Sequence, residues 1–121
     1  MEVHRIIRDM THGAFHLLWW LIVGHALADF VLQSSAMAAG KNRHHQGHPG
    51  EPPWYYWLAA HALIHGGVVG IVTGSAGLGV AEFVAHGLID FGKCEGVYGF
   101  NTDQAFHLVC KLFWISIVGG I

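Results

Sequence analysis

The stretch WYYWLAAHALIHGGVVGIVTG, residues 54–74, places two histidines in a segment that contains no charged residue. Its length matches the roughly 20 residues that an α-helix needs to cross a bilayer. The aromatic residues at its start are typical of a membrane–water interface. His61 and His65 are four positions apart, so a helix would present both on one face. The stretch therefore predicts a membrane helix that carries a pair of imidazoles.

Three further apolar segments have the same character. They are residues 14–33, 78–91 and 102–120, of which 78–91 is short for a full span. Residues 2–12 place apolar side chains on one face, as an interfacial amphipathic helix does. Residues 34–53 contain all three prolines and form a polar loop. We therefore expect an all-α fold, in which residues 1–121 form a single domain: a compact up-down four-helix transmembrane bundle with an N-terminal amphipathic helix.

The composition of the chain favours a membrane protein. Only 12% of the 121 residues are charged, about half the share in a soluble domain. The mean hydropathy is +0.42, and the 17 glycines suit closely packed membrane helices. The net charge of −2 and the lack of a basic block argue against nucleic acid as a partner. We expect membrane lipid as the partner; a soluble helical bundle with the same site is the alternative.

One spacing recurs in all four apolar segments: a histidine and a second metal-binding residue four positions apart. The pairs are His25 and Asp29, His61 and His65, His86 and Asp90, and Asp103 and His107. Residues at this spacing lie about 5–6 Å apart on one helix face, close enough to hold one ion. In an up-down bundle the four pairs can occupy one layer on the side of the polar loop. The recurrence predicts a single shared site.

The chemistry of these eight residues predicts a metal centre. Aspartate costs roughly 2.5–3.5 kcal/mol at the middle of a membrane helix, so such groups persist where they pair, face water or bind metal. Five imidazoles and three carboxylates exceed the needs of one ion, and we expect two divalent ions. Mixed nitrogen and oxygen ligands suit zinc, with manganese or iron as alternatives. A metal-free network of hydrogen-bonded histidines and aspartates is the other interpretation.

Two polar residues extend the same helix faces. Glu82 precedes His86 by four positions, and Lys111 follows His107 by four. We predict catalytic roles for both: Glu82 as a proton carrier or as the partner of a ligand, and Lys111 as the binder of an anionic substrate group. A buried ion pair between Glu82 and Lys111 is the alternative.

The remaining histidines fall into two groups. His16 precedes His25 by nine residues, about half a circle around a helix, so we expect His12 and His16 to point away from the site. The polar loop contains His44, His45 and His48. For these three the sequence leaves three interpretations open: metal loading, a lid over the site, or no role.

The motifs HALADFVLQ, HALIH, HGLIDF and DQAFH resemble the bacterial and phage membrane proteins known as domain of unknown function 3307. The resemblance covers all four apolar segments and leaves out the N-terminal arm and the histidine-rich loop. A looser similarity connects the chain to inner-membrane proteins described as metal-dependent hydrolase-like. The resemblance implies a compact integral membrane protein of the bacterial inner membrane, or a phage-encoded equivalent.

We expect a membrane-embedded dinuclear metal-binding protein. The favoured function is a metal-dependent hydrolase that acts on a phosphoester or ester at the membrane interface, with a lipid-linked or phosphorylated substrate. A metal-ion binding or transport protein, which a homo-oligomer would favour, is one alternative. A di-iron oxidoreductase is another. Lys41, Arg43 and Lys93 outnumber Arg5 and Arg8 at the opposite side, which predicts a site facing the cytoplasm.

Overall fold

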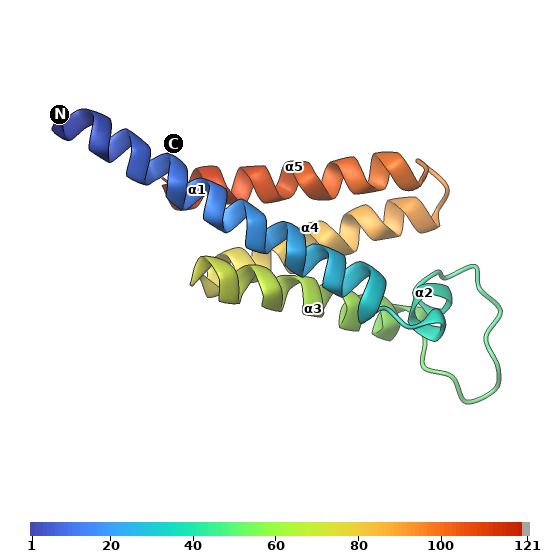
Figure 1. Ribbon diagram of the computed structural model, residues 1–121. Coiled ribbons are helices and arrows are strands. Elements are labelled where there is room, and N and C mark those ends of the chain that lie inside the picture. The colour runs from blue at the N-terminus through green and yellow to red at the C-terminus, as the bar shows by residue number, and fades with distance from the viewer. Residues whose placement is uncertain (120–121) are drawn as a thin grey trace.

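The computed structural model describes residues 1–119, and every regular element in that range is helical (Figure 1). The elements are α1 (Glu2–Ala26), the π-helical turn η1 (Leu27–Val31), the short α2 (Ser35–Gly40), α3 (Trp54–Thr73), α4 (Ala76–Cys94) and α5 (Phe100–Gly119). In Figure 1, α3, α4 and α5 run side by side and α1 crosses them obliquely. The start of α1 and the last turn of α5 lie toward one end of the bundle, and α2 with the long loop lies at the other.

The sequence predicted a separate amphipathic helix at the N-terminus. In the structure this arm is instead the first part of α1. Gly13 lies at the expected break, but one glycine costs only about 1 kcal/mol relative to alanine. The first turns extend beyond the bundle (Figure 1) and leave Val3, Ile6 and Ile7 exposed. The arm therefore offers an apolar surface without contributing to the core.

The other helix boundaries also differ from the prediction. The third long helix is not short, because α4 begins at Ala76 and continues to Cys94, beyond the predicted range 78–91. The fourth begins at Phe100, two residues before the predicted start, and its predicted end at residue 120 lies outside the described residues. The loop predicted for 34–53 contains a helix, α2, because Ser34 Oγ caps it by accepting a hydrogen bond from Met37 N at 3.1 Å.

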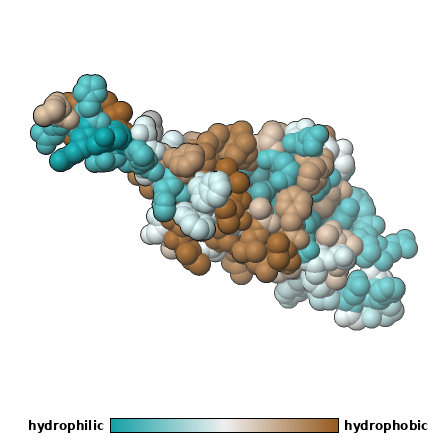
Figure 2. All heavy atoms as spheres, viewed as in Figure 1, coloured by the Kyte–Doolittle hydropathy of each residue, from teal (hydrophilic) through white to brown (hydrophobic). Residues whose placement is uncertain are grey.

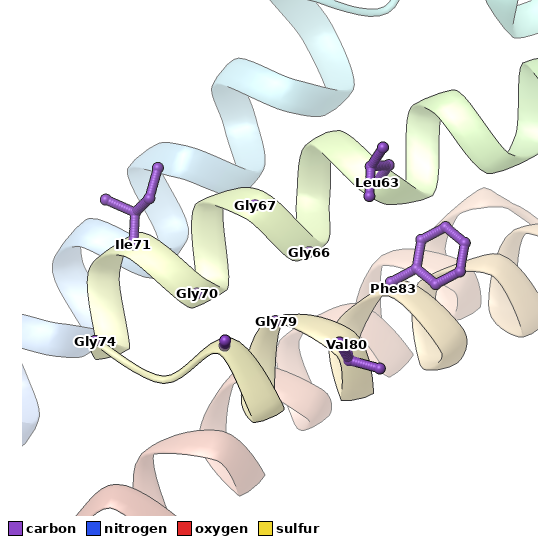
Figure 3. A pocket seen from close by; sticks show the side chains of 10 residues that line it. Leu63, Gly66, Gly67, Gly70, Ile71, Gly74, Gly79, Val80 and Phe83 are labelled. Atoms are coloured by element: carbon purple, nitrogen blue, oxygen red, sulfur yellow. The ribbon is translucent and has the colours of Figure 1, made fainter.

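Glycines bring α3 and α4 into close contact (Figure 3). A Cβ atom at Gly66 would lie 2.6 Å from the carbonyl oxygen of Gly79, and one at Gly79 would lie 2.8 Å from that of Gly66. Gly74 ends α3 with a φ of +69°, a backbone conformation that glycine adopts without strain. Ser75 then caps α4 by accepting a hydrogen bond from Leu78 N at 3.2 Å. The two helices form an antiparallel hairpin whose separation only glycine permits.

Polar residues fill much of the interior, and apolar residues cover much of the outside. Among the described residues, nine polar or charged side chains are buried, against six hydrophobic ones. Figure 2 shows hydrophobic residues gathered over the middle of the molecule, with hydrophilic residues at both ends. In a soluble domain a buried polar cluster and a large exposed apolar surface are both exceptional. The distribution therefore requires an explanation from function or environment.

Two helical stretches, Glu2–Val31 and Trp54–Thr73, are long and apolar enough to cross a membrane. The helices α4 and α5 do not meet that test of length and hydropathy. Charged residues lower the hydropathy of both helices. Glu82 and Asp90 in α4 and Asp103 and Lys111 in α5 are buried, and Lys93, in the last turn of α4, is partly exposed. The outer surfaces of α4 and α5 are therefore more apolar than their sequences suggest.

Candidate metal centre

All eight predicted ligand residues lie in one cluster between the long helices, in the half of the bundle near α2. Asp29 of η1 forms one centre of this cluster. Its Oδ1 atom lies 2.8 Å from His65 Nε2 and 3.2 Å from His61 Nε2. Its Oδ2 atom lies 3.3 Å from His25 Nε2. One carboxylate therefore faces three imidazoles from two helical segments.

Asp90 of α4 forms the second centre. His61 Nε2 lies 3.3 Å from its Oδ2 atom, and His107 Nε2 lies 3.2 Å from its Oδ1 atom. His86 Nε2 is 3.6 Å from Asp90 Oδ2 and 4.0 Å from the Asp29 carboxylate, between the two centres. Asp103 Oδ1 lies 3.4 Å from His107 Nε2. The two aspartates are thus joined by shared histidines.

The position of Asp29 depends on a local change in helix type. The residues Leu27–Val31 form a π-helical turn, a wider form of helix that is rare and often found at functional sites. Gln33 Nε2 donates a hydrogen bond to the backbone oxygen of Asp29 at 3.0 Å and supports this turn.

Several buried polar atoms of the cluster have no hydrogen-bond partner among the described residues. Both ring nitrogens of His61 and both of His86, His107 Nδ1 and Asp103 Oδ1 form no hydrogen bond of favourable geometry. Nevertheless, His61 Nε2 lies within 3.3 Å of two carboxylates, and Asp103 Oδ1 lies 3.4 Å from His107 Nε2. The rings are also crowded, because those of His65 and His86 stack with their centres 3.6 Å apart. Leaving such atoms unsatisfied in a protein interior is costly. Shared cations would satisfy several of them at once.

Among the described residues there are three groups of potential ligands, of which two share no residue; the third, Glu82, His86 and His107, overlaps both. Ligand atoms of Asp29, His61, His65 and His86 all lie within 4.8 Å of one another, and so do those of Asp90, Asp103 and His107. The first group offers three imidazoles and one carboxylate, a set that suits tetrahedral zinc. The second offers one imidazole and two carboxylates. His25 belongs to neither group.

Gln104 is a cluster residue that the sequence analysis did not select. Its Nε2 atom donates to Asp29 Oδ2 at 3.0 Å and to Asp103 Oδ2 at 3.2 Å. Its Oε1 atom lies 3.0 Å from His25 Nε2. The residue stood in the motif DQAFH, so its position beside Asp103 was the signal that could have identified it. Gln104 therefore forms hydrogen bonds with the carboxylates of Asp29 and Asp103, which belong to η1 and α5, and with the Nε2 atom of His25.

Residues 17–118 match the family model described as protein of unknown function (DUF3307). The chain belongs to the DUF3307 family. The matched range includes every residue of the cluster described above. No curated protein and no solved structure matches this DUF3307 chain significantly.

Glu82 and Lys111 of the DUF3307 chain form the buried ion pair that was the alternative to catalytic roles. Lys111 Nζ lies 2.5 Å from Glu82 Oε1, and Trp114 Nε1 donates to Glu82 Oε2 at 2.6 Å. The pair adjoins the cluster, since His86 Nδ1 lies 3.5 Å from Glu82 Oε1. Glu82 is therefore placed to orient His86 from the side opposite its Nε2 atom. Catalytic roles for Glu82 and Lys111 remain predictions.

The loop after α2 is attached to the end of α4. Arg43 donates two hydrogen bonds to the Glu95 carboxylate, at 2.5 and 2.9 Å, and His44 Nε2 lies 3.2 Å from the same group. These hydrogen bonds, those of Arg43 above all, hold the pKa of Glu95 below its ordinary value. Of the loop histidines, only His44 contacts a carboxylate of another segment among the described residues. His12 and His16 are exposed on α1, outside the cluster.

Proposed function

We propose that this chain is a four-span membrane protein that holds two divalent metal ions between its helices. The observation that carries the proposal is the convergence of imidazole and carboxylate groups from α1, η1, α3, α4 and α5, with buried ring nitrogens left unsatisfied. A hydrogen-bonded polar core without metal is the alternative, because the Nε2 atom of each of the five histidines lies within 4 Å of an aspartate oxygen.

The distribution of polarity supports the membrane placement. A lipid environment accounts for the exposed apolar surface and for a buried core rich in charged groups. The four long helices α1, α3, α4 and α5 each have enough residues to cross a bilayer. The basic residues Lys41, Arg43 and Lys93 near the α2 end favour a cytoplasmic position for the cluster in a bacterial inner membrane or a phage-encoded equivalent.

The two ligand groups suggest one ion each. Asp29, His61, His65 and His86 would hold the first, for which zinc is the best match. Asp90, Asp103 and His107 would hold the second, and manganese or iron also accept such mixed ligands. His25 would then act beside the ions, through Asp29 and Gln104, and not as a ligand.

The chemistry that best fits such a centre is hydrolysis of a phosphoester or ester at the membrane interface. Two bound ions activate a water molecule and polarise the oxygen of a phosphoryl or carbonyl group. Within the chain, Glu82 would position His86, and Lys111 would add positive charge beside the centre. Because the reactive centre would lie within the membrane, we expect it to act on a lipid-linked or phosphorylated substrate.

Metal analysis of the purified protein in detergent tests the proposal. After zinc loading and removal of free ions, we expect about two zinc ions per chain. His65→Ala should lose at least one ion, whereas His16→Ala, which alters an exposed histidine of α1, should lose none. The proposal is wrong if the wild-type chain retains no zinc, manganese or iron.

The same preparation separates the functional alternatives. Zinc or manganese together with turnover of a generic phosphoester or ester supports the hydrolase. Bound iron with redox-dependent absorbance supports an oxidoreductase, and metal flux into liposomes without turnover supports transport.

A further inference from the structure

The cluster has one accessible side. The side chains of His25 and Asp29 are 14% and 10% exposed. The other six predicted ligand side chains are between 0% and 3% exposed. Both accessible residues belong to the α1–η1 segment, so a molecule from outside can reach the cluster along this segment.

A hollow opens at this accessible side, between α1 and α5. It has a volume of about 300 Å³ and is lined by Ile22, His25, Gln104, Leu108 and Lys111. Ile22 and Leu108 form an apolar rim, and each is 45% exposed. The other three residues are polar and belong to the cluster or adjoin it. The hollow therefore changes from apolar at its mouth to polar at its floor.

The floor contains hydrogen-bonding groups that are not fully used. His25 Nδ1 is buried and has no hydrogen-bond partner among the described residues. Lys111 Nζ donates one hydrogen bond, to Glu82, although an ammonium group can donate three. Because Gln104 Oε1 accepts a hydrogen bond from His25 Nε2, the Nδ1 atom of a neutral His25 can accept one from a protonated oxygen in the hollow. Lys111 can donate, and its positive charge favours an anionic group.

A second hollow continues along the same pair of helices toward the chain ends. It has a volume of about 370 Å³, and its lining is mostly apolar: it includes Met10, Leu17, Ile115 and Val118, together with the ring of His16. Since α1 and α5 border both hollows, the helix pair offers an apolar surface that leads to a polar end at His25. A molecule with an apolar tail and a polar head matches this order.

The loop side of the cluster is closed by comparison. Lys41 is buried and bonded to Asp90 at 2.5 Å. The next segment is attached to α4 through Arg43 and Glu95. Entry from the loop would require these ionic contacts to break, whereas entry between α1 and α5 would not.

From these observations we infer that the cluster receives its substrate sideways, between α1 and α5, and that this substrate is a membrane lipid with an anionic phosphate-type head. The head would lie against His25 and Lys111, and the first part of the tail between Ile22 and Leu108. The inference rests on the proposed function for the reaction at the cluster, but the binding site itself is defined by the residues of α1 and α5.

The test uses the full chain in detergent, loaded with zinc, and dioleoyl phosphatidic acid as the probe. Native mass spectrometry measures the number of lipids bound and their relative affinity. We expect one phosphatidic acid per chain, with dioleoylglycerol and inorganic phosphate each binding at least about tenfold more weakly. Equal binding of inorganic phosphate would overturn the lipid assignment, and equal binding of dioleoylglycerol would overturn the role of the anionic head.

Variants of the rim test the location. Ile22→Trp and Leu108→Trp would narrow the mouth without altering a cluster residue, and each should weaken phosphatidic acid binding at least about tenfold. Val109→Trp is the matched control, because Val109 is 61% exposed on the same helix and does not line the hollow. Equal affinity in all three variants would overturn the inference, as would a wild-type chain that binds no phosphatidic acid.

Zinc content, measured on each variant, separates this inference from the proposed function. If the chain retains no metal but its lipid binding still depends on Ile22 and Leu108, the metal centre is rejected and the lateral binding site is supported. If the chain binds two zinc ions but its lipid affinity does not change in the rim variants, only the lateral binding site is rejected. If a tryptophan variant loses zinc, the smaller changes Ile22→Phe and Leu108→Phe replace it, with the same expected direction.

Discussion

Lys41 Nζ lies 2.5 Å from Asp90 Oδ2, and both side chains are buried. Lys41 follows the last turn of α2, so this contact joins the loop side of the molecule to α4. It also gives Asp90 a cationic partner beside the imidazoles of His61 and His107. The Asp90 carboxylate, which belongs to the second ligand group, is therefore paired with a positive charge that the chain itself supplies.

Replacing Lys41 should destabilise the metal-free protein. Lys41→Met leaves the Asp90 carboxylate buried without its ammonium partner, which typically costs about 3–5 kcal/mol of unfolding free energy. Lys93→Met is the control, because Lys93 is a third exposed and lies 3.9 Å from Asp103, and we expect less than about 1 kcal/mol. Chemical unfolding in mixed detergent micelles measures both. Similar losses for the two variants would contradict this assignment.

The ion pair of Glu82 and Lys111 can be tested by removing one or both charges. Glu82→Gln should lower the unfolding free energy by about 3–5 kcal/mol, because Lys111 then remains buried and unpaired. The double variant Glu82→Gln/Lys111→Met should recover a large part of that loss, since no unpaired charge is left. The same unfolding assay applies. A double variant less stable than Glu82→Gln alone would show that Lys111 has another essential partner.

The α3–α4 contact predicts opposite outcomes for neighbouring glycines. Gly66→Ala places a methyl group 2.6 Å from the Gly79 carbonyl oxygen, and such overpacking typically costs about 1–3 kcal/mol. Gly67→Ala meets nothing within 4 Å, and should leave stability unchanged or raise it by up to about 1 kcal/mol. Thermal unfolding of the two variants in detergent compares them. A Gly67→Ala variant as unstable as Gly66→Ala would contradict the close packing.

Metal removal should lower stability if the proposed centre exists. A ligand present at 100 times its dissociation constant stabilises a fold by about 2.7 kcal/mol. Treatment with a chelator should therefore lower the melting temperature, and added zinc should restore it. His65→Ala, which removes a ligand of the first group, should reduce this response, and His16→Ala should keep it. An identical melting temperature with and without chelator would argue against a bound ion.

The attachment of the loop to α4 should weaken in acid. The pKa of Glu95 is lowered by its hydrogen bonds, chiefly those from Arg43. A lowered folded-state pKa means that the contact is fully present above the ordinary pKa of glutamate and is lost as pH falls through the lower value. NMR titration of the Glu95 carboxyl group in micelles measures this midpoint. Arg43→Ala should raise it toward the ordinary value, and His44→Ala should raise it less; no change in Arg43→Ala would reject the contact.

The sequence alone identified the four long helices and eight residues of the cluster, though not Gln104, because both depend on local periodicity. Side chains four positions apart share a helix face whatever the helix packs against. This is why His61 with His65, and His86 with Asp90, could be selected before any tertiary contact was known. The same local rule did not reveal that α1 is continuous from Glu2, because residues 2–12 are amphipathic and the segment from residue 14 is apolar, a change of character that does not require the helix to end.

The tertiary structure decided which of these residues meet. Lys41 and Asp90 are distant in sequence, and no periodic pattern connects a residue after α2 with one in α4. The exclusion of His25 from both ligand groups, and the accessible hollow between α1 and α5, likewise depend on how the helices are rotated and spaced. Periodicity determines the face on which a side chain lies, but the partner of that face is set by long-range packing, which local sequence does not encode.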